Sequence, residues 1–247
     1  MTETNTQQTE RPPRNAQLRQ NELIIRRFVL NQPASRMGLR PGWFRNSLTG
    51  EEREHLRCHL LCWRRGRVYF EGGDATMPTC KSNDGLKPSP VIDQPKREAC
   101  GSVDSEGNFV PECPLAAWRY RNGTRCAPPC RETWSFLGIL EDDDLPFWIS
   151  LKGASLRPAR RLLSMCYEVM RADRRDLLDC GITISARLVE GRSFDYYVVA
   201  FSDPQWLAKS DKRRKQLKRK LRKFGRADIQ ATFDAEQSDA EPPALAG

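Results

Sequence analysis

Residues 55–70 read HLRCHLLCWRRGRVYF, and this stretch decides the fold. Its apolar residues include pairs two positions apart, 61 with 63 and 68 with 70, which is typical of a strand that buries one face. We therefore expect either one long bent strand or a hairpin here. The residues expected to pack inward are Leu61, Trp63, Val68 and Phe70. The arginines expected at or near the bend are Arg64, Arg65 and Arg67.

Regular structure resumes after Cys130. Residues 133–140 (TWSFLGIL) and 146–151 (PFWISL) are expected to be strands, and so are 181–190 and 194–201. Apolar residues recur at helical spacing over 156–170, where Pro158 falls in the first turn. The predicted fold class is mainly β with α (α+β). Because a Greek-key barrel of the OB type places a helix between its third and fourth strands, we expect an OB-like five-stranded barrel.

Residues 71–130 interrupt this pattern. They are rich in Gly, Pro, Asn, Asp and Cys and contain few aliphatic runs, so they cannot bury enough apolar surface to order themselves. Five cysteines fall inside this insertion: Cys80, Cys100, Cys113, Cys126 and Cys130. A tetrahedral thiolate site supplies folding free energy of order 10 kcal/mol in small zinc modules. We therefore expect a structural Zn²⁺ ion to order the insertion.

Four of the five cysteines are expected to bind the metal: Cys80, Cys100, Cys113 and Cys130. Cys126 is the expected bystander, although Cys126 and Cys130 can exchange roles. Residues 81–85 (KSNDG) form a tight-turn sequence that can aim backbone amides at thiolate sulfurs. No CxxC pair is present, so a scatter of free thiols remains the alternative. A second set, His55, Cys58, His59 and Cys62, fits ordinary strand residues better than a ligand face.

The whole chain divides into segments of different character. It has 41 Lys and Arg against 32 Asp and Glu, a net charge of +9 that favours a polyanionic partner. It has no apolar run of the roughly 20 residues that a membrane span needs, and no apolar signal region. We therefore expect a cytoplasmic protein that does not engage a membrane, with reduced cysteines. The expected segments are a disordered arm (1–22), an OB-like domain (23–204), a basic helix (205–226) and a disordered acidic tail (227–247).

Catalytic motifs are missing. His55 and His59 are the only histidines, and no Ser-His-Asp order, HExxH or Walker sequence is present. A deaminase pattern is also absent, because Pro129-Cys130 is followed by Arg131-Glu132-Thr133 rather than by a second cysteine. The sequence predicts a protein that is not an enzyme. The acidic run 141–144 can bind a divalent cation, although such runs are more often solvated turns.

Basic and aromatic residues suggest a nucleic-acid interface. Single-strand binders stack bases on exposed rings inside a basic groove, and dense positive clusters repel themselves without a polyanion. The candidate contacts are Arg64, Arg65, Arg67, Trp148, Lys152, Arg157, Arg160, Arg161, Lys212, Arg213, Arg214, Lys215, Lys218, Arg219 and Lys220. The acidic tail can fold back on the basic helix or recruit replication proteins.

Several motifs together give a family resemblance. They are 80–85 (CKSNDG) with Pro88, Cys113-Pro114 with Trp118, 129–133 (PCRET) and 146–155 (PFWISLKGAS). From Pro41 to Leu163 the chain resembles cysteine-rich proteins of phages and mobile elements described as hypothetical or single-stranded-DNA-binding. The resemblance implies a zinc-containing, OB-like protein in a bacterial host cell. Such proteins have a close cysteine pair where this chain has Cys100 and Cys113, so Cys100 is the least secure ligand.

The predicted function is single-stranded DNA binding in phage, plasmid or mobile-element DNA replication or recombination. A sequence-specific duplex-DNA regulator with structural zinc is one alternative, and it would place the basic helix in the major groove. A metal-dependent replication enzyme using the acidic run is another. An RNA-binding accessory factor fits the same sequence features as the first hypothesis.

Overall fold

A computed structural model describes residues 25–33, 38–71, 78–89, 98–191 and 193–223. The chain is mainly β with helices, as predicted. The expected arm 1–22 and acidic tail 227–247 lie outside the described residues. The elements are β1 (Arg26–Leu30), β2 (Phe44–Asn46), β3 (Glu52–Arg53), β4 (Leu56–Tyr69), β5 (Cys80–Ser82), β6 (Gly101–Val103), β7 (Phe109–Pro111), β8 (Arg119–Arg121), β9 (Thr124–Cys126), β10 (Arg131–Leu140), β11 (Pro146–Lys152), η2 (Gly153–Ser155), α1 (Leu156–Asp173), η3 (Leu177–Asp179), β12 (Cys180–Val189), β13 (Tyr196–Phe201), β14 (Gln205–Trp206) and α2 (Lys212–Lys223).

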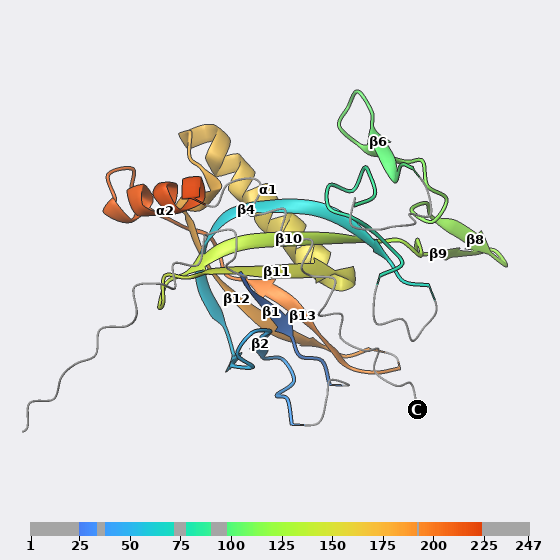
Figure 1. Cartoon of the computed structure of the whole chain (residues 1–247), viewed down its shortest axis with the longest axis horizontal. Helices are drawn as coiled ribbons and strands as arrows, with labels where there is room; N and C mark the ends of the chain where they lie inside the picture. The colour runs from blue at the N-terminus through green and yellow to red at the C-terminus, as the bar shows by residue number, and fades with distance from the viewer. Residues whose placement is uncertain (1–24, 34–37, 72–77, 90–97, 192, 224–247) are drawn as a thin grey trace, which may run out of the picture.

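Strand β4 organises the molecule. It is one continuous strand rather than a hairpin, and it belongs to a ten-stranded sheet in the order β13-β12-β4-β10-β11-β1-β2-β3. On one edge its first four residues (56–59) pair with β12 and its last three (67–69) with β5, while β10 pairs along most of its length on the other edge. In Figure 1 it arches across the top of the sheet. Both long pairings are antiparallel, so β4 connects the two ends of the fold.

The sheet is open, which corrects the expected five-stranded closed barrel. The N-terminal strand β1 pairs in parallel with β11, with Arg26 opposite Phe147 and Phe28 opposite Ile149. Strands β2 and β3 then extend the sheet beyond β1. β1 therefore occupies the free edge of β11, and the strand path ends at β13 on one side and at β3 on the other.

Side chains on the two faces of the sheet form two apolar clusters. Phe147 and Ile149 of β11 face the larger cluster, which α1 covers, whereas Trp148 faces the smaller cluster under α2. Such alternation is expected of a strand that has a packed cluster on each face. The inward positions predicted on 55–70 are only partly correct: Leu61 is buried, but Trp63 and Phe70 are 37% and 38% exposed.

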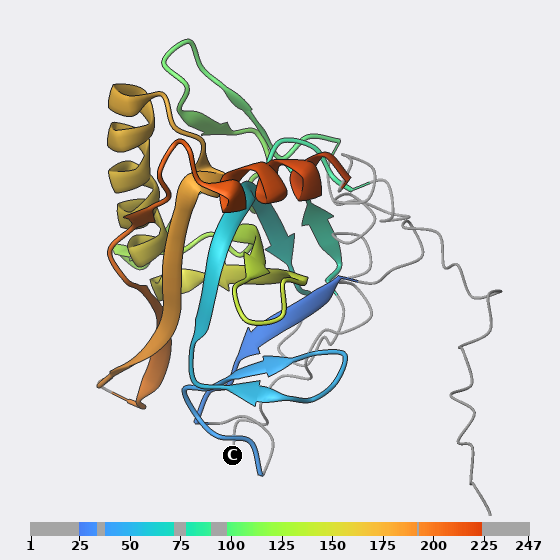
Figure 2. The same ribbon diagram turned by 90° about the vertical axis from the view of Figure 1, so that its left-hand side faces the viewer.

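The two helices lie on different parts of the sheet. In α1, the buried residues Leu156, Ala159, Leu162 and Cys166 recur every three or four positions and pack on the larger cluster. The basic helix starts at Lys212, because residues 205–206 form the short strand β14 instead. Figure 2 shows α2 passing in front of β4, with α1 beyond β12. Among the described residues, neither helix is long and apolar enough to cross a bilayer.

Candidate zinc centre and nucleic-acid interface

The insertion is attached to the sheet at one end of β4. Cys80 begins β5 and lies opposite Tyr69 of β4. Cys130 directly precedes β10, whose first residue lies opposite Val68. Val68 is also opposite Lys81, so β5 and β10 flank the same residue of β4 from its two sides. The sheet register therefore brings Cys80 and Cys130 to the same place, although 50 residues separate them in the sequence.

Backbone hydrogen bonds draw the other two cysteines to this place. The Cys100 amide donates to the Leu86 carbonyl at 2.7 Å, and the Cys113 amide donates to the Cys100 carbonyl at 3.2 Å. The Cys130 amide donates to the Leu115 carbonyl at 2.8 Å. Cys100, Cys113 and Cys130 are thus tied by their own main chain to other parts of the insertion, whereas Cys80 pairs with β4.

The four thiols are buried close to one another. Cys80, Cys100, Cys113 and Cys130 are 5–7% exposed. The pKa of Cys130 is raised to about 12, chiefly by burial; Arg67 lowers it, and the neighbouring Cys100, Cys80 and Cys113 add smaller raising contributions. Burial also raises the pKa of Cys100, with smaller raising contributions from Cys80 and Cys113. The four groups are therefore electrostatic neighbours.

Cys126 is separate from this group. It lies at the end of β9, is partly exposed, and donates to the carbonyl of Thr124 at 3.6 Å. It is absent from the interactions that shift the pKa of Cys100 and Cys130. The structure thus groups the four cysteines that the sequence analysis selected, Cys100 included.

The four sulfurs do not form a closed coordination shell as they stand. Within the described ranges, no set of three Cys, His, Asp or Glu side chains converges closely enough to hold a metal ion. A tetrahedral zinc site has Zn–S distances of about 2.3 Å, so the thiols would have to move inward to bind the ion. The donor type and number fit Zn²⁺. The packing of the thiols is looser than in a metal-bound site.

The carboxylate of Asp84 holds the turn after Cys80 together. The carboxylate of Asp84 accepts hydrogen bonds from the amides of Leu86 and Lys87 at 2.8 and 2.9 Å and from the Ser82 hydroxyl at 3.0 Å. Burial opposes ionisation of Asp84, but these bonds outweigh it and lower its pKa. The amides of Leu86 and Lys87, which follow residues 81–85, therefore stabilise the turn. A contact between the amides of 81–85 and thiolate sulfurs stays a prediction.

A groove runs between α1 and the strands β12 and β13. Its volume is about 700 Å³, and three arginines line it: Arg157 and Arg161 from α1 and Arg187 from β12. Within the described residues these arginines make no hydrogen bond or ion pair. The rings of Tyr196 and Phe201 also line the groove, and Asp203 is its only acidic lining residue. The groove is therefore open, basic and partly aromatic.

A second basic and aromatic cluster lies across α1 from the groove. The ring centroids of Trp63 and Trp134 are 4.8 Å apart. Arg65 and Arg160 approach Trp134, with guanidinium carbons 5.6 and 5.5 Å from its ring centroid. The carboxylate of Glu132 contacts both guanidinium groups, at 3.3 and 2.8 Å. These two arginines are already paired, unlike the arginines of the groove.

Helix α2 uses one face to dock on the sheet. Leu217 is fully buried in the smaller cluster. Arg213 and Lys220 contact Asp144, and Arg214 contacts the buried Asp179 at 2.6 Å. Lys218 pairs with Asp176 at 2.9 Å. Four of the seven α2 residues expected to contact phosphate therefore pair with acidic side chains of the protein.

The opposite face of α2 remains basic. Lys212, Lys215, Arg219 and Arg222 are exposed and follow one another at intervals of three or four residues, so they form one row along the helix. Within the described part of the chain, none of them makes a hydrogen bond or ion pair. This row can contact phosphates without undocking the helix.

The acidic turn between β10 and β11 is a centre of ion pairs. Asp143 receives two hydrogen bonds from Arg26, at 2.5 and 2.6 Å. Asp142 contacts Arg53 at 2.7 Å, and Asp144 contacts α2 as described above. A divalent cation would have to displace these guanidinium and ammonium groups to bind here.

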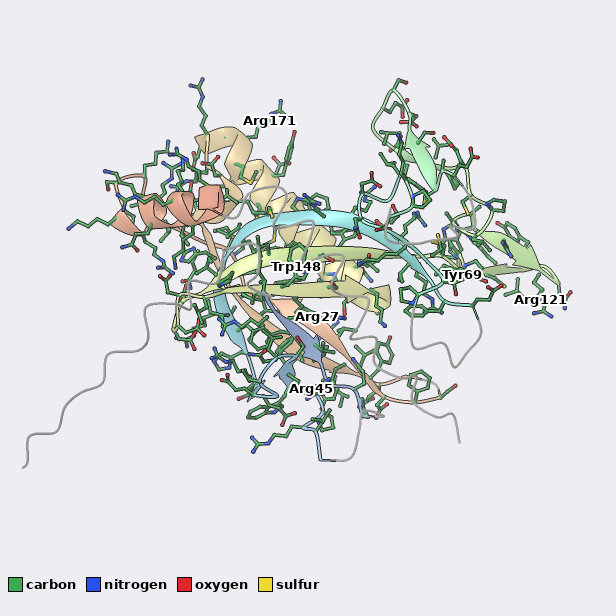
Figure 3. All side chains as sticks on the ribbon, viewed as in Figure 1. Arg27, Arg45, Tyr69, Arg121, Trp148 and Arg171 are labelled. Carbon is green, nitrogen blue, oxygen red and sulfur yellow. The ribbon has the colours of Figure 1, made fainter. Side chains whose placement is uncertain are left out.

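The remaining predicted contacts are dispersed. Arg67 is buried, donates to the Cys130 carbonyl at 3.2 Å and covers the Phe109 ring, so it supports the insertion. Arg64 lies on β4 and Lys152 ends β11. Trp148 is 1% exposed in the cluster under α2, so the structure corrects its expected role as a stacking platform (Figure 3). Alternation alone does not show which face of a strand a helix will cover.

Sequence reasoning missed two residues that line the groove, Arg187 and Tyr196. Both lie on correctly predicted strands, and Arg187 is a charged residue in an otherwise largely apolar run, which marked it as outward-facing. What the sequence did not reveal was that α1 packs beside this face and turns it into a groove. No family model, no curated protein and no solved structure matches the chain.

Proposed function

We propose that the protein binds single-stranded DNA through the groove between α1 and β12–β13, with Zn²⁺ as a structural ion in the insertion. The observation that carries the proposal is the set of Arg157, Arg161 and Arg187, which have no internal partner in the described residues and line one open groove. Arginines in such a position gain free energy when phosphates release counterions. Tyr196 and Phe201 add ring surface for unpaired bases.

The arrangement of elements supports an OB-like relationship. Strands β4, β10 and β11 come first, then α1, then β12 and β13, and β12 returns to β4 in antiparallel orientation. This order of strands around one helix supports an OB-like relationship, in an open sheet in which β1 lies beside β11. We propose that the protein acts in the cytoplasm of a bacterial host, in replication or recombination of phage, plasmid or mobile-element DNA. A role for the tail 227–247 in recruiting replication proteins stays a prediction.

The test is fluorescence anisotropy against labelled single-stranded DNA, duplex DNA and single-stranded RNA across a salt series. Each phosphate contact on a single strand contributes about 0.7 to the slope of log K against log salt. The triple variant Arg157→Gln, Arg161→Gln, Arg187→Gln should therefore lower the slope by about 2. Arg171→Gln, on an exposed residue near the end of α1, is the matched control and should leave the slope unchanged.

The outcomes separate the alternatives. Preference for the single strand that depends on the three groove arginines supports the proposal. Stronger binding to one duplex sequence would favour a regulator, and stronger binding to RNA would favour an RNA-binding factor. Affinity that ignores both salt and the triple variant would overturn the groove as the binding site.

A further inference from the structure

The insertion carries a projecting hairpin that the proposed groove does not use. Strands β8 and β9 pair with Arg119 opposite Cys126 and Arg121 opposite Thr124. Asn122 and Gly123 connect them with φ values of 51° and 76°, a two-residue turn that matches the natural twist of a hairpin. Figure 1 shows this hairpin at the outer edge of the insertion, at the end of the molecule opposite α2. We call residues 118–126 the finger.

One face of the finger is aromatic and cationic. Trp118 and Tyr120 are two residues apart in the chain, and Arg125 is directly opposite Tyr120 on the paired strand. The Arg125 guanidinium carbon is 4.2 Å from the centroid of the Trp118 ring. Trp118 is 55% exposed and Tyr120 is 74% exposed. Two rings and a guanidinium plane therefore lie together, facing solvent.

The other face of the finger is basic. Arg119 donates to the carbonyl of Pro114 at 3.1 Å, which holds the start of β8. Arg121 lies at the tip and points away from the sheet (Figure 3). The finger contains three arginines and no acidic residue, and within the described residues none of the three arginines forms an ion pair.

The base of the finger is anchored close to the group of four cysteines. The finger lies between Cys113 and Cys130 in the sequence, and the amide of Cys130 is bonded to the carbonyl of Leu115. Ala116, just before the finger, is buried. The finger is thus a projection with a fixed base rather than a cover for the core.

This chemistry fits unpaired nucleobases. Exposed rings stack on bases because every base has a π-face, and a guanidinium group adds a cation–π contribution. The arginines supply charge for the adjoining phosphates. Paired bases in a duplex offer no free face to such a platform except at an end.

We infer that the finger stacks unpaired bases and sets the preference for single strands, while the groove arginines supply salt-dependent affinity for the backbone. This inference rests on the proposed function, because it assigns a second contact region on the same DNA strand. It divides the binding free energy into a part that depends on bases and a part that depends on phosphates. The two parts can be measured separately.

The experiment compares oligo(dT) with an abasic oligodeoxynucleotide of the same length, using the full chain with zinc and anisotropy as the readout. The variant Trp118→Ala, Tyr120→Ala should bind oligo(dT) roughly tenfold or more weakly, because base stacking on a ring is usually worth at least that much. Its affinity for the abasic strand should change by less than about twofold. Tyr120→Phe, which keeps a ring, should retain oligo(dT) binding.

Two controls keep the result specific. Tyr167→Ala removes a ring that is 58% exposed on α1, outside the finger, and should leave the ratio of the two affinities unchanged. Zinc content and thermal midpoint of the finger variant should match those of the unmodified protein, which separates loss of stacking from loss of folding.

The inference and the proposed function fail in different ways. Suppose that the unmodified protein binds oligo(dT), and that the finger variant has the same ratio of oligo(dT) affinity to abasic-strand affinity as the unmodified protein. The finger then does not stack bases, and only the inference is wrong. If the unmodified protein binds neither strand, the proposed function falls as well. A finger that binds a protein partner instead of DNA would also leave this affinity ratio unchanged.

Discussion

Gly101 shows how closely the strands of the insertion pack. A Cβ atom at this position would lie 2.3 Å from the Phe109 ring and 2.5 Å from the Val110 carbonyl oxygen. The ring of Phe109 in turn lies under the Arg67 guanidinium carbon, 4.1 Å from it. Because Gly101 has no side chain, the hairpin β6–β7 can pack over the end of β4.

We expect Gly101→Ala to destabilise the insertion by about 1–3 kcal/mol, because a backbone carbonyl oxygen cannot move aside as a side chain can. Hydrogen exchange of residues 98–113 should accelerate while exchange of the sheet stays slow. Ser102→Ala, at an exposed neighbouring position, is the control. Unchanged exchange in the glycine variant would mean that the hairpin has more room than the structure describes.

Trp148 is expected to act on stability and not on binding. Its side chain is 1% exposed, so Trp148→Ala should lower the free energy of unfolding by about 3–5 kcal/mol. Urea unfolding followed by circular dichroism measures this. Trp148→Phe, which retains more of the buried volume, should keep the affinity for single-stranded DNA within about twofold. A large loss of affinity in this milder variant would restore Trp148 as a contact residue.

Among the elements, those with strong local patterns were predicted well. Strands β10, β11, β12 and β13 and helix α1 begin and end within three residues of the expected limits. Their apolar periodicities are long enough to distinguish strand from helix. The pairing of β1 with β11 was not predicted, because strand partners are chosen by tertiary contacts that leave no periodic signal in either strand.

The docking of α2 depends on Asp144. We expect Asp144→Asn to weaken docking by at most about 1 kcal/mol, since the carboxylate and its partners Arg213 and Lys220 are partly exposed. Faster hydrogen exchange in α2 would report the change. Asn at this position also leaves Arg213 and Lys220 without their acidic partner. The slope of log K against log salt for DNA binding should therefore stay the same or steepen. A shallower slope would contradict the docking geometry.

Acid should have the same effect as this substitution. Burial opposes ionisation of Asp144, but hydrogen bonds from Lys220 and Arg213 outweigh it and lower its pKa. The stabilisation is therefore complete above the unfolded-state pKa of about 3.9 and is lost as pH falls through the lower folded-state value. Exchange in α2 measured below pH about 4 should approach that of the Asn variant. An α2 that stays equally protected in acid would show that the ion pairs of Asp144 are not needed to hold it.

For the molecule as a whole, the grouping of the four cysteines was easier to predict than the groove, while zinc binding itself stays a prediction. Four ligands could be selected because a segment without a core needs another source of order, and the structure buries those four thiols together. The groove could not be predicted, because it exists only where α1 packs beside β12 and β13. The finger was overlooked because its residues are too few and too irregular to give a periodic signal.

Zinc binding should distinguish Cys126 from the four grouped cysteines. Cys126→Ser should retain about one zinc per chain, whereas Cys130→Ser should lose it, because a structural site needs all four ligands. Metal content by mass spectrometry measures both. A chelator should accelerate hydrogen exchange within 78–130 and leave β10–β12 protected. Equal zinc loss in the two variants would overturn the assignment.

The central position of β4 also determines the order in which the protein can fold. Leu56 pairs with Ile184 and Gly66 pairs with Thr133, so neither edge of β4 has its long partner until much of the chain has been made. During synthesis on a ribosome, most of this strand must wait without its long partners, because only the short β5 is made soon after it, and such long-range pairings fold slowly. Its run of arginines at 64, 65 and 67 then has a second benefit, since charge on an open strand edge discourages pairing with other nascent chains.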